Sequence, residues 1–91
     1  MTVFTWDEQK NKLLKLSRDI SFEEIVLAIR NDNVISEEPH PNQKKYPNQF
    51  IFIIEYQNYT FVVPFEKIDT NTYLLKTIFK DRRYLKLLKK P

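Results

Sequence analysis

Apolar residues recur every three to four positions over two N-terminal segments, which is the spacing of α-helices that bury one face. We predict a first helix over residues 8–17 and a second that begins at Ser21 and ends near Asn31. The buried stripe of the first helix consists of three leucines: Leu13, Leu14 and Leu16. The second helix buries four apolar side chains: Phe22, Ile25, Val26 and Ile29.

Both helices are predicted to begin at a capping box, in which a hydroxyl side chain precedes a glutamate by three residues. The two pairs are Thr5 with Glu8 and Ser21 with Glu24. A short β-prone segment over residues 2–5 precedes the first helix. These caps set the N-terminal boundaries of both helices.

Two runs rich in aromatic and β-branched residues, 50–56 and 59–65, are separated only by Gln57-Asn58. Such a two-residue connection predicts a β-hairpin. The first run carries apolar side chains on both faces, so we expect a central strand that is covered on both sides. Further strands are predicted at 34–36 and 72–79.

Prolines at three positions keep residues 37–48 from regular structure, which predicts a long loop. Asp81 is expected to cap a final helix with an apolar stripe of four residues: Tyr84, Leu85, Leu87 and Leu88. The elements together predict one α+β domain over residues 1–91, with two N-terminal helices and a C-terminal helix on a mainly antiparallel sheet of four to five strands.

The chain contains no glycine and no cysteine. Phosphate-binding loops and the G-x-S-x-G elbow need glycine, and disulfides and thiolate metal sites need cysteine, so these classes are excluded. Left-handed backbone positions must then fall to five Asn or Asp residues between periodic segments: Asp19, Asn31, Asn33, Asn48 and Asn58. No apolar run approaches the ~20 residues of a membrane span, so we expect a soluble, cytoplasmic protein.

Positive charge is concentrated at the C-terminal end, although the net charge is only +3. Residues 76–91 hold seven lysines and arginines against one acidic residue, Asp81. Three of the cations, Arg82, Lys86 and Lys89, fall on one ridge of the predicted final helix. We expect this end to bind a polyanion or an acidic partner.

Several segments resemble motifs of BrnT-type toxins. Phe4-Thr5-Trp6-Asp7-Glu8-Gln9-Lys10 matches their F-x-W-D-x-x-K segment, and Ile20-Ser21-Phe22-Glu23-Glu24 matches V/I-S-F-E-E at the same distance. His40-Pro41-Asn42-Gln43-Lys44-Lys45-Tyr46-Pro47-Asn48 is similar to the H-P-N-Q-x-K-Y-P-N loop of one branch. The strand at Lys76-Thr77-Ile78 that leads to Asp81-Arg82-Arg83 is similar to the basic C-terminal turn, so the resemblance extends from about residue 3 to 88.

The resemblance implies a RelE-like fold and the toxin of a type II toxin–antitoxin module, a metal-independent ribonuclease that inhibits translation. Its substrate would be RNA, free or on the ribosome. A cognate DNA-binding antitoxin would neutralise it in a hetero-oligomer, covering the cleft between residues 40–49 and Arg82. Many family members carry Lys-His-Gly where this chain has Ser17-Arg18-Asp19. Arg18 can hold a phosphate there, but a guanidinium does not shuttle protons at neutral pH.

Three residues are candidates for catalysis: His40, Lys45 and Arg82. RNA cleavage through the 2′-OH needs proton transfer and cations that stabilise the extra charge on phosphorus. His40 is the one side chain whose ordinary pKa lies near neutrality. Lys45 offers a cation in the same predicted loop. Arg82 offers a planar guanidinium that can bind two phosphate oxygens.

Six further residues are candidates for RNA binding: Arg18, Lys44, Tyr46, Arg83, Lys86 and Lys89. Five supply positive charge, and the Tyr46 ring can stack on a base. The single histidine has no metal-ligand partner at helical spacing, so neither a metal nor a cofactor is expected. Trp6 is expected to pack the first helix against the sheet.

Two other functions fit the same residues. The chain can be an RNA- or ribosome-binding module that does not cleave, or a protein-interaction domain that takes an acidic partner. Cleavage would produce cyclic-phosphate ends, and RNA binding alone would show a steep salt dependence. A protein-interaction domain would show neither.

Overall fold

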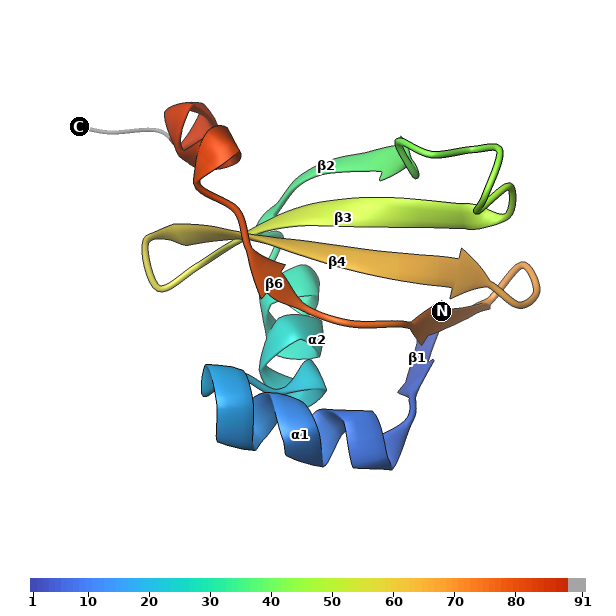
Figure 1. Cartoon of the computed structure of the whole chain (residues 1–91), viewed down its shortest axis with the longest axis horizontal. Helices are drawn as coiled ribbons and strands as arrows, with labels where there is room; N and C mark the ends of the chain where they lie inside the picture. Colours follow the sequence, from blue (N-terminus) through green and yellow to red (C-terminus); the bar gives the residue numbers. More distant parts are fainter. Residues whose placement is uncertain (89–91) are drawn as a thin grey trace.

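The computed structural model describes residues 1–88 and contains a six-stranded sheet with helices on both faces (Figure 1). The strand order is β1-β5-β4-β3-β2, and β6 also pairs with β4. Of the strand pairs within residues 1–88, only β1–β5 is parallel. The elements in chain order are β1 (Val3–Trp6), α1 (Glu8–Arg18), α2 (Phe22–Arg30), β2 (Val34–Pro39), β3 (Gln49–Tyr56), β4 (Tyr59–Lys67), β5 (Thr72–Leu75), β6 (Phe79–Lys80) and the 3₁₀-helix η1 (Arg82–Leu87).

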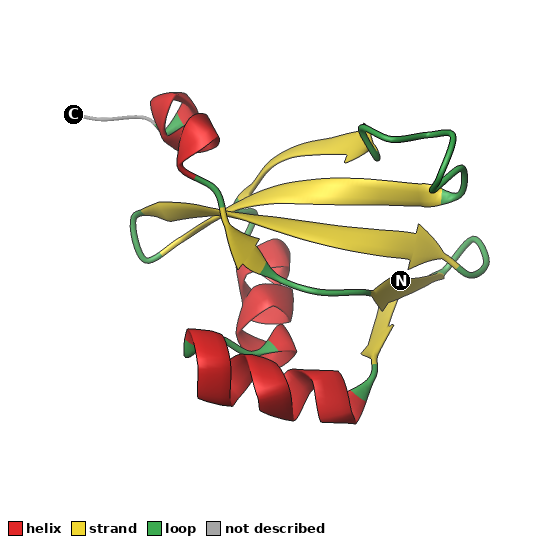
Figure 2. Cartoon of the chain, viewed as in Figure 1, coloured by secondary structure: helices red, strands yellow, loops and turns green. Residues whose placement is uncertain are grey.

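Two layers flank the sheet. In Figure 2 the α-helices α1 and α2 lie on one side of it, and η1 lies on the other. The α+β architecture predicted from the sequence is thereby confirmed, with one more strand than expected. Within residues 1–88 no helix is long and apolar enough to span a membrane.

The β3–β4 hairpin is confirmed and forms the centre of the sheet. Gln57 and Asn58 connect its strands with φ of 53° and 60°. Positive φ at both positions is what a type I′ turn requires, and its twist matches that of the strands. Phe52 and Ile54 face the helix side, while Ile51 and Ile53 face the other side, so β3 is covered on both faces as predicted.

The helix-side core contains Leu14, Phe22, Ile25 and Phe65, which are all almost fully buried. Trp6 stacks on Phe22 with ring centroids 5.6 Å apart, which agrees with its predicted packing role. These side chains fix the two α-helices on the sheet.

The predicted leucine stripe of α1 is wrong. Leu13 and Leu16 are 61% and 86% exposed, whereas Leu14 is buried beside Asn11. The Asn11 side chain accepts a hydrogen bond from Phe22 N at 2.8 Å and donates to Glu23 Oε1 at 2.7 Å. These polar contacts rotate α1 so that Asn11, and not the two outer leucines, faces α2.

The N-terminal cap of α1 also differs from the prediction. Thr5 lies within β1 and pairs with Leu74, so it cannot cap the helix. Asp7 caps α1 instead, and its Oδ1 accepts from the backbone N–H of Gln9 at 2.8 Å. The second capping box, Ser21 with Glu24, is present as predicted.

The predicted strand over residues 72–79 is interrupted at residues 76–78, which separates β5 from β6. Lys76 N donates to Pro64 O at 2.8 Å, but proline has no N–H to complete the pair.

The strand at 34–36 is longer than predicted, because residues 37–39 also pair with β3. The final helix begins at the Asp81 cap, as expected, but it is a 3₁₀-helix.

Positive φ occurs at Asp19 and Asn58, as predicted, and also at Asp32 and Gln57. Asp19 ends α1 in the left-handed region with φ of 54°. Asn31, Asn33 and Asn48 are not among the positive-φ residues, so those three predictions are wrong. Asp and Asn tolerate this region better than other residues that carry a Cβ, which explains how three of these four positions manage without glycine.

Candidate functional site

A groove lies on the face of the sheet opposite the α-helices. It consists of two adjoining pockets of about 140 and 400 Å³, which share His40 and Pro64. The smaller pocket is also lined by Pro41, Ile51, Val62, Phe79, Arg83 and Tyr84. The larger is also lined by Tyr46, Gln49, Lys76 and Thr77. We call the two pockets together the His40 groove.

The loop over residues 40–48 is held by its own hydrogen bonds. His40 N donates to Gln49 O at 3.0 Å, and Gln43 Nε2 donates to His40 O at 2.7 Å. Asn42 Oδ1 accepts from Lys45 N at 3.1 Å, which tightens the loop around Asn42. The loop therefore presents His40 in a defined position, although it lies outside the sheet and contains two prolines, Pro41 and Pro47.

The His40 ring is oriented by the backbone two residues later. Asn42 N donates to His40 Nδ1 at 3.0 Å, so Nδ1 is an acceptor and carries no proton. The hydrogen bond thus assigns the proton of the neutral ring to Nε2. The remaining ring nitrogen of His40 is therefore a hydrogen-bond donor.

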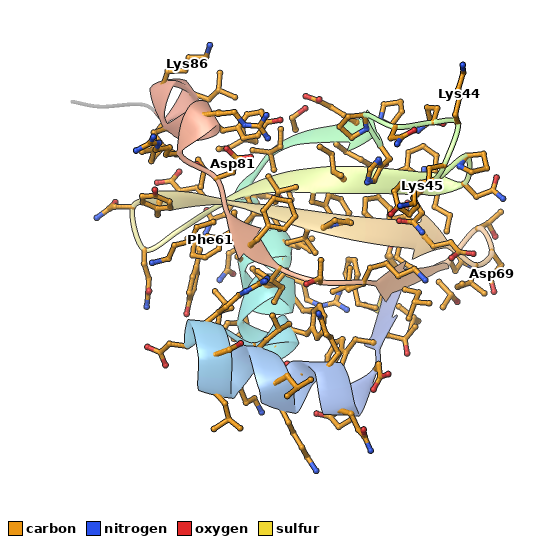
Figure 3. The ribbon with its side chains drawn as sticks, in the orientation of Figure 1. Lys44, Lys45, Phe61, Asp69, Asp81 and Lys86 are labelled. Carbon is orange, nitrogen blue, oxygen red and sulfur yellow. The ribbon has the colours of Figure 1, made fainter. Side chains whose placement is uncertain are left out.

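Tyr46 lies beside this imidazole, and Lys45, which lines neither pocket, lies beside the Tyr46 ring. The His40 and Tyr46 ring centroids are 4.5 Å apart, and Lys45 Nζ lies 5.4 Å from the centroid of the Tyr46 ring. The structure thus brings three of the predicted site residues together. Lys44, in contrast, points away from the sheet (Figure 3).

Arg83 enters the groove from η1 on the opposite side of the smaller pocket. Its guanidinium donates to both carboxylate oxygens of Asp81, with Nη2 to Oδ2 at 2.6 Å. Hydrogen bonding from Arg83 holds the pKa of the Asp81 carboxyl below its ordinary value, and the carboxylate raises the pKa of Arg83 in turn. The neighbouring Arg82 is exposed, lines neither pocket and makes no ion pair within residues 1–88.

This ion pair predicts a pH-dependent stability. Because the folded-state pKa of Asp81 is lowered, the pair stabilises the fold above the ordinary value of 3.8, and this stabilisation is lost as the pH falls below it. Asp81→Asn keeps a capping oxygen but removes the charge. We expect the free energy of unfolding of wild type and variant to differ more at about pH 7 than at about pH 2.5. Urea unfolding measures this, and an equal difference at both pH values would contradict it.

Lys76 and Thr77 line the groove but were not among the predicted site residues. Lys76 Nζ lies 3.4 Å from Glu66 Oε1, so its charge is held at the sheet edge beside Pro64. The sequence carried one signal for this position. A proline at position 64, within a predicted strand, indicates that the hydrogen bonds to the neighbouring strand are interrupted there. Such an interruption changes the direction of nearby side chains.

Arg18 lies on the helix side of the sheet and not at the His40 groove. Its Nη1 donates to Ile78 O at 2.6 Å, and the Ile78 side chain is buried in the helix-side core. Lys86 is exposed and points away from the sheet (Figure 3). Lys89 lies outside the described residues. No cluster of metal-ligating side chains occurs in the part of the chain that the structure describes.

Comparisons with known proteins identify the fold. No protein-family model matches the sequence, and no curated protein matches it. The structure is similar to the 1.1 Å crystal structure of the Brucella abortus ribonuclease toxin BrnT, with a TM-score of 0.66 and 13% sequence identity. The match covers 89% of this chain and 97% of that one. A likeness that spans nearly the whole of both chains shows that this protein has the fold of a BrnT-type toxin.

Proposed function

We propose that this protein is a ribonuclease toxin of a type II toxin–antitoxin pair, which cleaves RNA without a metal ion and is neutralised by a DNA-binding antitoxin. One observation carries the proposal. In a chain with the fold of a ribonuclease toxin, the His40 groove joins an imidazole and a tyrosine ring from one loop with an arginine from η1. These are the groups that bind and polarise a phosphodiester beside an unstacked base.

The proposal gives a role to each side chain. A base stacks on Tyr46, and the adjacent phosphate lies between His40 and Arg83. The Nε2–H of His40 donates to a phosphate oxygen, while Arg83 and Lys45 offset the negative charge that develops on phosphorus. Arg82 lies next to Arg83 in sequence and contributes to the field along the RNA backbone.

The reaction that fits these groups is transfer within the RNA. The 2′ oxygen attacks the adjacent phosphorus and loses its proton, while the 5′ oxygen leaves and gains one. The products are a 2′,3′-cyclic phosphate and a 5′-hydroxyl end. Such positioning and charge stabilisation do not need a strong base on the protein.

The test is incubation of purified protein with single-stranded RNA in excess EDTA, followed by analysis of both new ends. We expect cyclic-phosphate and 5′-hydroxyl ends from the wild type, and strongly reduced cleavage by the Lys45→Ala, Arg83→Ala double variant. The matched control is Lys10→Ala, Lys12→Ala, which removes the same charge from α1, away from the groove. Intact RNA with tight, salt-dependent binding would instead indicate a module that binds RNA without cleaving it.

The same variants test the biological role. Induction of the wild type in a bacterial host is expected to arrest growth and to produce new 5′-hydroxyl RNA ends. The control variant is expected to do the same, and the groove variant to permit growth at equal expression. Growth arrest by the groove variant at undiminished strength would contradict the proposal.

A further inference from the structure

A further pocket lies outside the His40 groove. It has a volume of about 580 Å³ and lies between the C-terminal end of α1 and β6. Its lining includes the buried side chains of Phe61 and Ile78 and the exposed side chain of Leu16. We call it the β6 pocket. None of the groups assigned to RNA cleavage lies in it.

Two features of this pocket are left unexplained by the fold. Leu16 is 86% exposed at its rim, although it is a large apolar residue within α1. Phe79, which lines both this pocket and the His40 groove, is 36% exposed. Exposed apolar side chains around a hollow are typical of a surface that binds a partner.

The backbone of β6 offers an open sheet edge at the same place. β6 pairs with β4 through Phe79↔Val62 and Lys80↔Phe61, and no other strand within residues 1–88 pairs with it. An extended peptide can add to such an edge, with main-chain hydrogen bonds for affinity and alternate side chains in pockets for specificity. Arg18 already donates a hydrogen bond to the carbonyl of Ile78, so a peptide can pair with this edge only near Lys80.

The charges around the pocket favour an acidic occupant. Among the described residues that line it, Arg18 and Lys80 are basic and Asp19 alone is acidic. RNA fits less well than peptide, because the lining is largely apolar. The Arg18 guanidinium uses Nη1 for the Ile78 carbonyl, and its other N–H groups remain available to a carboxylate. A peptide with a carboxylate beside an apolar side chain can pair with the cations of the lining and pack against its apolar residues.

We propose that the β6 pocket docks an extended acidic segment of a partner protein. Its backbone adds to the free edge of β6, one apolar side chain lies between Leu16 and Phe61, and its carboxylates pair with Arg18 and Lys80. The identity of that partner as the antitoxin rests on the proposed function. Since Phe79 borders both pockets, a segment seated here that continues over Phe79 reaches the His40 groove and covers it.

The test uses a displayed library of ten-residue peptides selected on the wild-type protein. We expect enriched peptides to pair an apolar residue with acidic neighbours and to shift the amide NMR signals of residues 16–20 and 78–80. Affinity is expected to fall at least tenfold in Leu16→Glu and in the Arg18→Gln, Lys80→Gln double variant. The matched control is Leu13→Glu, which lies on the same helix, is 61% exposed and does not line the pocket.

Three outcomes would overturn the proposal: peptides that bind Leu16→Glu as tightly as wild type, peptides that shift only His40 and Tyr46, or a short single-stranded RNA that shifts the β6-pocket signals in place of peptide. Circular dichroism shows whether each variant is folded. The peptide measurement does not depend on RNA cleavage, so an inactive protein that binds acidic peptides here would refute the ribonuclease but not the docking site.

Discussion

Replacement of His40 by alanine is expected to lower the rate of RNA cleavage by about a hundredfold, the effect of losing one preorganised donor to the reacting phosphate. Among residues 1–88, His40 and Pro64 are the two that line both parts of the groove. Its Nδ1 is committed to the backbone of Asn42, so Nε2–H is the group that can reach RNA. Single-turnover cleavage of a defined RNA measures the effect.

His40→Gln separates two roles of the imidazole. A glutamine amide can place an N–H near the position of Nε2, but it cannot transfer a proton at neutral pH. If His40 acts as a donor, we expect glutamine to recover most of the activity that alanine loses. Equal inactivity of both variants would show instead that His40 transfers a proton, and the Asn42 contact would then have to break during the reaction.

The sequence was most informative where local chemistry decides the structure. The hairpin, the Ser21–Glu24 capping box and the Asp81 cap depend on residues close in sequence, and all three are present. The loop that carries His40 was also predicted, and its hydrogen bonds lie almost entirely within residues 40–49. Local hydrogen bonds of this kind can be predicted without the fold.

The site was harder to predict where tertiary contacts decide it. Arg82 and Arg83 are equivalent by charge, but the Asp81 carboxylate draws Arg83 into the groove and leaves Arg82 outside it. Lys76 enters the groove because Pro64, twelve residues earlier, interrupts the ladder. Arg18 is turned to the other face by the carbonyl of Ile78, sixty residues away. The Asp81–Arg83 pair is local in sequence, but the contacts that place Lys76 and Arg18 do not follow from spacing along the chain.

The spacing of apolar residues predicted the wrong buried face of α1, because a tertiary contact of Asn11 decides which face is buried. Loss of that contact is the change for which we expect the largest effect on stability. Asn11 is fully buried, and its side-chain oxygen accepts from the N–H of Phe22 at the first turn of α2. That N–H has no partner within its own helix. Asn11→Ala is therefore expected to lower the free energy of unfolding by about 2–3 kcal/mol, since a buried donor is left unpaired.

Asn11→Leu makes the test sharper, because the apolar pattern alone would predict that a leucine on this buried face stabilises the helix. We expect it to destabilise the protein, since leucine cannot accept from Phe22 N. Urea unfolding measures both variants. Leu13→Ala is the control on the same helix, with an expected change within about 0.5 kcal/mol because Leu13 is mostly exposed.

Glu23 provides a second measurement of the same contact. The amide of Asn11 is the main cause that lowers the pKa of Glu23 below its ordinary value of 4.5. In Asn11→Ala the pKa of Glu23 is expected to rise toward that value, which an NMR titration detects without unfolding the protein. If stability and this pKa both stay unchanged, the buried amide does not hold the two helices together. A leucine-faced α1, as the sequence pattern predicts, would then be the better description of the helix in solution.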